Sequence, residues 1–179
     1  MKAAVVGAGI TGVTTAYYLA KAGYEVTIYD ERRYPAMATS YANGGQLSAS
    51  NAETWNSWRS VYKGAKWLFR ADAPLKINPF PNLDKYSWFF KFIREIPNAE
   101  INTQRTCEMA LQAHGLYKEI AEQEGIQFDK VEKGILHIYT DEKEFENARR
   151  VNKIYHQAGL KRWEVSAVSY THLRAHETG

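Results

Sequence analysis

The sequence has little cysteine, no long apolar run and little net charge. Its one cysteine, Cys107, cannot form an internal disulfide, so nothing points to an oxidising compartment. No stretch approaches the roughly 18 consecutive apolar residues of a membrane-spanning helix. The net charge of +3 is too weak to indicate a nucleic-acid partner by itself. A cytoplasmic protein that does not bind nucleic acid is therefore expected.

The composition is otherwise that of a globular protein. Hydrophobic residues make up 45% of the chain and charged residues 24%, which excludes the disordered, collagen-like and low-complexity classes. The 179 residues can form one domain, or one domain and part of a second, and are too few for most complete two-domain enzymes. No metal site is predicted, because the histidines are not paired with cysteine or carboxylates at ligand spacing.

The N-terminus has the pattern of a buried strand followed by a glycine-rich turn. Residues 3–6 are short and apolar, as in a parallel strand, and Gly7-Ala8-Gly9-Ile10-Thr11-Gly12 comes next. Gly7 permits the turn, Gly9 lets the backbone approach a pyrophosphate, and Gly12 lets a helix pack closely on the sheet. The same glycines interrupt the apolar run that a secretory signal would need.

A helix and a second strand complete the pattern. Small and apolar residues recur at helical spacing after Gly12, and Gly23 can end the helix. Residues 25–29 alternate as a strand and place Asp30 at its end, 18 residues beyond Gly12, where a carboxylate can bind ribose hydroxyls. The free amides at the helix start would face a diphosphate. We therefore predict an α/β fold with a Rossmann-like βαβ unit that binds a dinucleotide.

The residues after Asp30 bear on which dinucleotide is bound. Glu31 disfavours a 2′-phosphate, although Arg32 and Arg33 leave that alternative open. An NAD-binding unit would continue with another helix and strand, whereas residues 32–50 are mostly small and polar. Such a loop can lie along an extended cofactor, or it can be a disordered surface loop.

Several short motifs carry a family resemblance. They are residues 5–12, residues 30–32 and residues 39–48, and residues 133–140 and 145–148 are also similar. The pattern Ser-x-Ala-Asn-x-Gly-Gln-x-Ser of residues 40–48 is the most specific of them. Together they resemble the FAD-dependent amine and D-amino-acid oxidoreductase superfamily, and within it the bacterial D-amino-acid dehydrogenases. The likeness extends from Lys2 to about Ala167.

The resemblance implies FAD as the cofactor and assigns binding residues. The diphosphate would be contacted by Gly7, Ala8, Gly9, Ile10, Thr11 and Gly12. The adenosine ribose would be bound by Asp30, with Glu31 beside it. The residues that run towards the flavin end would be Ser40, Asn43, Gly44, Gly45 and Gln46. Backbone groups should matter most in this second loop (residues 39–48), so Gly44→Val should weaken FAD binding more than Ser48→Ala.

The resemblance also implies an activity. The enzyme would oxidise a D-amino acid to a 2-oxo acid and ammonia by hydride transfer to FAD, and pass the electrons to a respiratory acceptor. A glycine- or sarcosine-oxidase-like enzyme that uses oxygen is the alternative, and an inactive truncated product is another. Because members of the family are much longer, the catalytic residues would follow residue 166 and are unknown. The expected divisions are residues 1–50 for FAD, 51–166 for part of an α+β substrate domain, and 167–179 for a non-native tail.

The middle of the chain is basic and aromatic. Residues 55–92 hold eleven of the 24 aromatic residues, and residues 54–94 hold eight Lys and Arg against two acids, a balance of 8 − 2 = +6. We expect helices that pack these aromatic rings into a substrate-side core. Peripheral contact with an anionic membrane surface is the main alternative, and single-stranded nucleic acid is less favoured.

Three elements are expected further along the chain: a helix over residues 98–124, a strand over 134–139 and a helix that is capped by Thr140 or Asp141 and runs to about Ala158. Cys107 on the first of these helices is expected to be buried packing. His137 and Tyr139 share one face of the strand by parity. Either this pair, or Leu136 and Ile138, would point towards the cofactor cavity.

Overall fold

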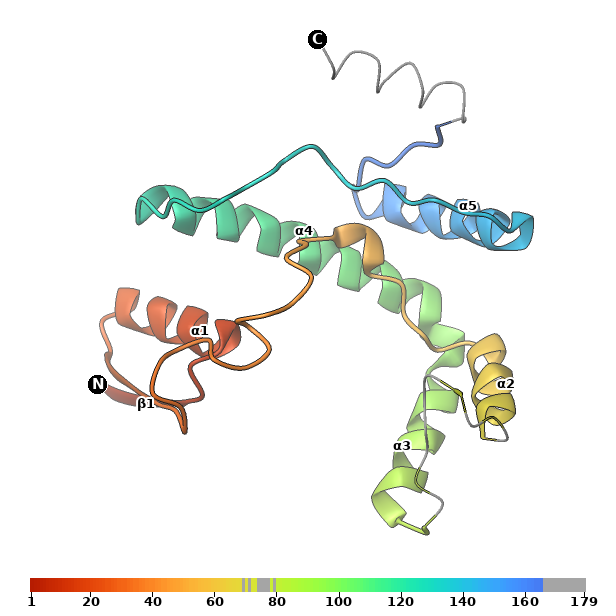
Figure 1. The fold of residues 1–179 in the computed structure, drawn as a ribbon, viewed down its shortest axis with the longest axis horizontal. Coiled ribbons are helices and arrows are strands. Elements are labelled where there is room, and N and C mark those ends of the chain that lie inside the picture. Colours follow the sequence, from red (N-terminus) through yellow and green to blue (C-terminus); the bar gives the residue numbers. More distant parts are fainter. Residues whose placement is uncertain (69, 71, 74–77, 79, 166–179) are drawn as a thin grey trace. The chain divides into compact units, whose positions relative to one another are not determined.

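A computed structural model describes residues 1–68, 70, 72–73, 78 and 80–165. The chain divides into two compact units, Met1–Leu47 and Ser48–Gly179 (Figure 1). The tail expected to be non-native, residues 167–179, lies outside the described residues. So do Phe69 and Lys76 of the basic, aromatic segment.

The first unit is a βαβ unit. Strand β1 (Lys2–Val6) pairs in parallel with β2 (Glu25–Tyr29), so that Lys2 lies opposite Glu25 and Val6 opposite Tyr29. Helix α1 (Ile10–Lys21) forms the crossover between them, as a parallel pair requires. The predicted order of strand, turn, helix and strand is confirmed.

Helix α1 ends where Gly23 was expected to stop it. Gly23 has φ +84°, and its N–H donates to the Ala20 carbonyl at 2.9 Å. The following N–H, of Tyr24, donates to the Leu19 carbonyl at 3.1 Å. These two bonds satisfy carbonyls that the helix end would leave without partners, and they turn the chain into β2.

The described part of the second unit is helical. Its elements are the short 3₁₀ turns η1 (Ala49–Asn51) and η2 (Ile96–Asn98) and the helices α2 (Trp58–Trp67), α3 (Leu83–Arg94), α4 (Ala99–Gln123) and α5 (Glu142–Gln157). Helix α5 packs against α4, and η1 also contacts α4. Side chains from these three elements and from Ala52 form the core: Ala49, Ala52, Cys107, Val151 and Tyr155. The expected burial of Cys107 is confirmed, since its side chain is 0% exposed.

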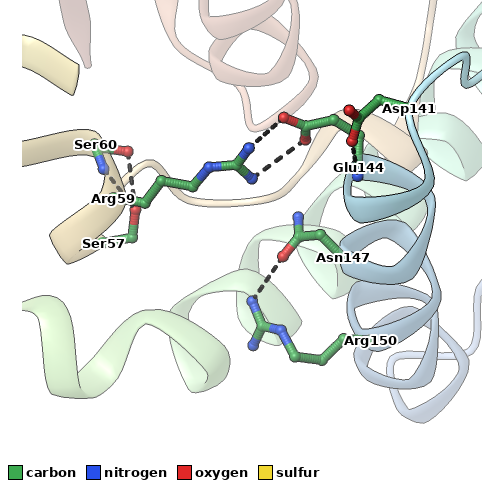
Figure 2. A network of polar contacts seen from close by, with 7 residues as sticks. All are labelled: Ser57, Arg59, Ser60, Asp141, Glu144, Asn147 and Arg150. Carbon is green, nitrogen blue, oxygen red and sulfur yellow. Dashed lines mark hydrogen bonds and ion pairs between the residues drawn. The ribbon is translucent and has the colours of Figure 1, made fainter. Parts of the chain in front are cut away.

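Polar side chains set the starts of the helices and join two of them. The N-cap side chains of Ser57 and Asp141 accept hydrogen bonds from the N–H groups of Ser60 and Glu144 at 3.1 and 3.0 Å. Figure 2 shows both caps, and it shows Arg59 of α2 paired with the carboxylate of Glu144 on α5. Of the two predicted caps, Thr140 and Asp141, the structure has Asp141, and the two long helices are confirmed.

The strand predicted over residues 134–139 is wrong for the described chain. These residues have no strand pairing, and the sheet found in the described part of the chain consists of β1 and β2 alone. A strand needs a hydrogen-bonded neighbour, and no described segment pairs with this one. The expected α+β character of the second unit is therefore not seen there.

The predicted aromatic core is also wrong for the described chain. Helices α2 and α3 form as expected, but neither contains a buried residue. Trp58 and Tyr62 on α2 are 65% and 62% exposed, and Trp88 and Phe90 on α3 are 56% and 67% exposed. The alternation of basic and aromatic residues predicted the helices correctly, whereas burial depends on which segments pack against them.

Candidate functional site

The turn between β1 and α1 depends on backbone conformations that glycine allows. Gly7 has φ +96°, and its N–H donates to the Tyr29 carbonyl at 2.7 Å, which ties the end of β1 to the end of β2. A Cβ on Gly12 would lie 1.8 Å from the Gly7 carbonyl oxygen. Any side chain at residue 12 would therefore push α1 away from the turn.

The start of α1 presents backbone N–H groups without helical acceptors. Its cap residue is Gly9, which has no side chain to accept from them, and the first helical bond runs from the Val13 N–H to the Gly9 carbonyl at 2.9 Å. The N–H groups of residues 10–12 therefore point out of the helix, where the positive end of its dipole also lies. This arrangement suits an anion such as a diphosphate.

Ser40 lies at this helix start. Its Oγ accepts a hydrogen bond from the Ile10 N–H at 3.0 Å, and a Cβ on Gly9 would lie 3.3 Å from the same oxygen. The sequence placed Ser40 among residues that run towards the flavin end. In the structure it belongs with the glycine turn, because its hydroxyl takes one of the N–H groups that a diphosphate would need.

Asp30 stands at the end of β2 and reaches back to the same turn. Its Oδ2 accepts from the Ala8 N–H at 2.6 Å, and its Oδ1 accepts from the Arg32 N–H at 2.7 Å. These two amide bonds, the Ala8 bond first, hold the pKa of the Asp30 carboxyl below its usual range, and the Arg32 charge adds to them. Asp30 is therefore ionised at neutral pH, and each oxygen keeps a lone pair for a hydroxyl donor.

A cavity of about 520 Å³ lies beside these groups, within the range typical of small-molecule sites. Its lining comes from Val6 and the glycine turn, from residues 29–32 and from residues 36–38. Val6 and Tyr29 end the two parallel strands, so the cavity lies at their carboxyl ends. Ligands of open parallel sheets bind at that edge.

The charged residues after Asp30 are already engaged. Arg32 lies 3.6 Å from Glu31 in an ion pair and donates to the Met37 carbonyl at 3.3 Å. The Arg33 guanidinium lies over the Tyr34 ring, 5.2 Å from its centre. Both arginines are thus held by protein groups, which favours a ribose hydroxyl over a 2′-phosphate beside Asp30.

The second loop contains a turn built by Asn43. The Asn43 Oδ1 accepts from the Gly45 N–H at 2.8 Å, while its Nδ2 donates to the Thr39 carbonyl at 3.3 Å. Gly45 has φ +61°, whereas Gly44 has no positive φ, and a Cβ added to Gly44 would meet no atom within 4 Å. Glycine is therefore required at residue 45 more than at 44, and Gly45→Val should disturb the conformation of the loop more than Gly44→Val. Gln46 is exposed.

Ala36 is a site residue that sequence reasoning missed. It has φ +59°, and its N–H donates to the Ala8 carbonyl at 2.9 Å, so the loop after β2 folds back onto the glycine turn. Alanine rarely adopts this conformation. The residue type at this position therefore gave no signal of the turn.

The remaining sequence candidates lie elsewhere. His137 and Tyr139 form hydrogen bonds within the second unit, His137 with Ser50 and Tyr139 with Arg162. Leu136 and Ile138 are 51% and 79% exposed. Among the described residues, no group of three or more His, Cys, Asp or Glu is placed to hold a metal ion. In the same part of the chain, no helix has the length and apolar character needed to cross a membrane.

Comparison with known proteins gives a consistent set of matches. A family described as FAD dependent oxidoreductase matches residues 2–177. The chain is 52% identical over 165 residues to D-amino acid dehydrogenase 3 of Mesorhizobium japonicum. The matched region covers 92% of this chain and 40% of that protein. It is 42% and 39% identical to the D-amino acid dehydrogenases of Paramagnetospirillum magneticum and Dechloromonas aromatica, over 90% of this chain and 39% of each relative. The chain thus spans about two fifths of the length of these relatives. No solved structure matches.

Proposed function

The chain belongs to the FAD dependent oxidoreductase family, and from this membership we propose that its first unit binds FAD in an enzyme that oxidises D-amino acids. The observation that carries the proposal is the arrangement around the glycine turn. The ionised Asp30 lines a cavity together with Gly7 and Gly9, its carboxylate is bonded to the Ala8 N–H, and the start of α1 follows directly, where the Ile10 N–H donates to the Ser40 hydroxyl. A diphosphate joined to a ribose needs N–H donors and a hydroxyl acceptor side by side.

Each residue of the site has a role in holding the cofactor. The N–H groups of residues 10–12 would donate to the diphosphate, and the Ser40 hydroxyl, which accepts from the Ile10 N–H in this structure, would contact the phosphate. Asp30 would accept from the adenosine ribose, and Asn43 with Gly45 would shape the second loop for the remainder of the cofactor. When bound, FAD would supply the redox chemistry, which is acceptance of a hydride from the substrate α-carbon. The imino acid would then be hydrolysed to a 2-oxo acid and ammonia.

Titration of the purified chain with FAD, followed by flavin fluorescence, tests the binding. Asp30→Ala should weaken FAD binding about 10-fold to 100-fold, because it removes the charge-assisted hydrogen bond to the ribose. Asp72→Ala is the matched control, since Asp72 is also an exposed carboxylate whose pKa is lowered, by Arg70, but it belongs to the second unit. No flavin bound at saturating FAD would overturn the proposal in favour of an inactive product.

Substrate and acceptor are tested with the full-length protein loaded with FAD. D-amino acids, L-amino acids, glycine and sarcosine are each supplied with a redox dye or with oxygen alone. Dye reduction with D-amino acids and without peroxide supports a dehydrogenase that passes electrons to a respiratory acceptor. Peroxide formed from glycine or sarcosine would instead identify an oxidase.

The exposed helices α2 and α3 support a second proposal, which is peripheral contact with an anionic membrane on its cytoplasmic face, where a respiratory acceptor would lie. Basic groups lie over aromatic rings on both helices: the Lys66 Nζ is 4.7 Å from the centre of the Tyr62 ring, and the Lys85 Nζ is 5.3 Å from that of Tyr86. Aromatic rings suit the headgroup level, and lysine suits anionic lipid.

Sedimentation with vesicles tests this contact. The chain should bind vesicles that contain phosphatidylserine and not neutral vesicles, and binding should fall at high salt. Replacing both Trp88 and Phe90 with alanine should reduce binding several-fold. Met109→Ala is the control, because Met109 is 64% exposed on α4. Equal binding by the double variant and the wild type would contradict the assignment.

A further inference from the structure

The connection between α4 and α5 is attached to the second unit through side chains. Residues 127–140 of this connection are all described, and none of them forms a backbone hydrogen bond with another described residue. Each of them except His137 is exposed. Segments with few buried contacts and little backbone pairing open at a low free energy. The contacts of His137 therefore decide how firmly this connection is held.

His137 is bonded to the turn η1, which is fixed independently of the connection. The His137 Nε2 lies 2.8 Å from Ser50 Oγ, which lies 2.9 Å from Ser48 Oγ. Ala49 and Ala52, on the two sides of Ser50, are 3% and 8% exposed and pack in the core of the unit. His137 thus attaches a weakly held segment to a firmly held one.

Two further attachments of the connection lie at the surface of α4. The Lys118 Nζ lies 3.1 Å from the Glu132 carboxylate, and the Tyr117 and Phe128 rings meet edge to face with 6.2 Å between their centres. All four residues are exposed. Exposed ion pairs contribute little to stability, so these contacts should not keep the connection in place once the His137 contact is lost.

The surroundings of His137 favour its neutral form. Burial lowers the pKa of His137, the positive charge of Arg162 lowers it further, and among the described residues no carboxylate acts on it. Arg162 is itself held, because its Nη2 donates to Tyr139 OH at 2.8 Å and its guanidinium lies 5.7 Å from the centre of the Tyr155 ring. The Ser50 hydroxyl, which faces His137 from η1, carries no charge. Protonation of His137 would therefore place a second positive charge beside a fixed one.

We propose that His137 is a pH-dependent anchor within the second unit: its neutral imidazole bonds to Ser50 and keeps the connection between α4 and α5 on η1, and its protonation releases the connection. This device belongs to the second unit alone and does not depend on a bound cofactor. Helices α4 and α5 stay packed after the release, because Cys107, Val151 and Tyr155 of their core lie outside the connection.

The direction of the pH dependence follows from the two states of His137. In the released connection His137 is in water and has its ordinary pKa, whereas in the attached connection its pKa is lowered. Release is therefore least favourable above the ordinary histidine range. It increases as the pH falls through that range, and it becomes constant below the lowered pKa of the attached form.

Limited cleavage by trypsin after Lys130 and Lys133, which are exposed in the connection, measures the release. The cleavage is followed by mass spectrometry between about pH 8 and pH 5, the range in which histidine changes charge. Each rate is divided by that of a free peptide of residues 126–140, which removes the pH dependence of the protease itself. At low protease concentration this ratio follows the population of the released form. It should rise about 2-fold to 10-fold as the pH falls, as for the loss of one hydrogen bond.

Four variants separate the anchor from other causes. His137→Gln, whose amide can bond to the Ser50 hydroxyl without titrating, should be cleaved slowly at every pH. Ser50→Ala should be cleaved about 2-fold to 10-fold faster than the wild type above the histidine range. Arg162→Gln, which can still donate to Tyr139, should show a smaller rise, because it removes the repelling charge. His114→Gln on α4 is the matched control and should keep the wild-type rise.

Three results would overturn the proposal. They are a wild-type cleavage ratio that does not change with pH, a rise that persists in His137→Gln, and wild-type cleavage of Ser50→Ala above the histidine range. Circular dichroism at each pH distinguishes release of the connection from unfolding of the unit. Helix content that stays constant while the cleavage ratio rises supports the anchor, whereas a parallel loss of helix would assign the rise to unfolding and would also overturn it.

Discussion

The two units of the molecule are stabilised in different ways. The first unit buries only Ala8 and Ala16, and its close contacts are those of backbone groups with one another and with Asp30 and Ser40. The second unit buries Cys107, Val151 and Tyr155 at 0%, 2% and 1% exposure. The first is therefore organised by backbone geometry and the second by side-chain packing.

This difference shows where function and stability reside. Backbone N–H groups and one carboxylate form a site that can bind a charged cofactor, and they need few large side chains to do so. Apolar packing in the second unit supplies the hydrophobic stabilisation and seats the turn that follows the second loop. Substitutions of the two kinds should therefore act on different units.

Tyr155→Ala should have the largest effect on stability. Truncation of a buried aromatic side chain costs about 3–5 kcal/mol, and Tyr155 is the largest fully buried residue of the core. Hydrogen exchange should become faster in peptides of α4 and α5 and change least in those of β1 and α1. Tyr62→Ala on exposed α2 is the control, with an expected change within about 0.5 kcal/mol. A loss below about 1 kcal/mol for Tyr155→Ala would contradict stabilisation of this unit by core packing.

Gly12→Ala should act on the first unit instead. The added carbon would lie 1.8 Å from the Gly7 carbonyl oxygen, and overpacking of this kind costs about 1–3 kcal/mol or more. Faster exchange should be confined to β1, α1 and β2, and FAD binding should be lost. Gly64→Ala is the control, since no atom lies within 4 Å of its added carbon. Equal exchange in both variants would show that α1 does not pack closely on the turn.

Replacement of two glycines that have different backbone conformations should change the stability of the protein in opposite directions. Gly115→Ala within α4 should stabilise the protein by about 0.5–1 kcal/mol, since alanine is the better helix former and nothing lies near the added carbon. Gly125→Ala should destabilise it by about 1–2 kcal/mol, because residue 125 has φ +61°. Thermal unfolding measures both. The same direction of change in both variants would contradict the positive φ of residue 125.

The amide bonds of Asp30 should persist to low pH, which is the smallest of these effects. The pKa of Asp30 is lowered in the folded chain, so its contribution is present above the ordinary aspartate range and is lost as the pH falls through the lowered value. Amide chemical shifts of Ala8 and Arg32 should therefore titrate together at a pH below that range. Asp30→Asn should remove the titration from both. A midpoint at or above the ordinary range would show that the two bonds do not form.

Much of the first unit could be predicted because its constraints are local. Gly7 and Gly12 occupy positions where a positive φ or a contact of 1.8 Å excludes a side chain, and such requirements appear directly as residue types. The cap at Asp141 is predictable for the same reason, since a cap and its helix are neighbours in the chain. The pairing of Ala36 with Ala8 was not predictable, because alanine is compatible with many conformations.

The sequence by itself determined the βαβ unit, the acid at the end of β2 and the long helices, since each depends on the spacing of residues within one segment. The tertiary structure decided the rest. It placed Ser40 at the start of α1, joined Ser50 to His137, left α2 and α3 exposed and left residues 134–139 without a strand partner among the described segments. Each of these depends on which distant segments meet, and contacts between segments follow from packing rather than from local pattern.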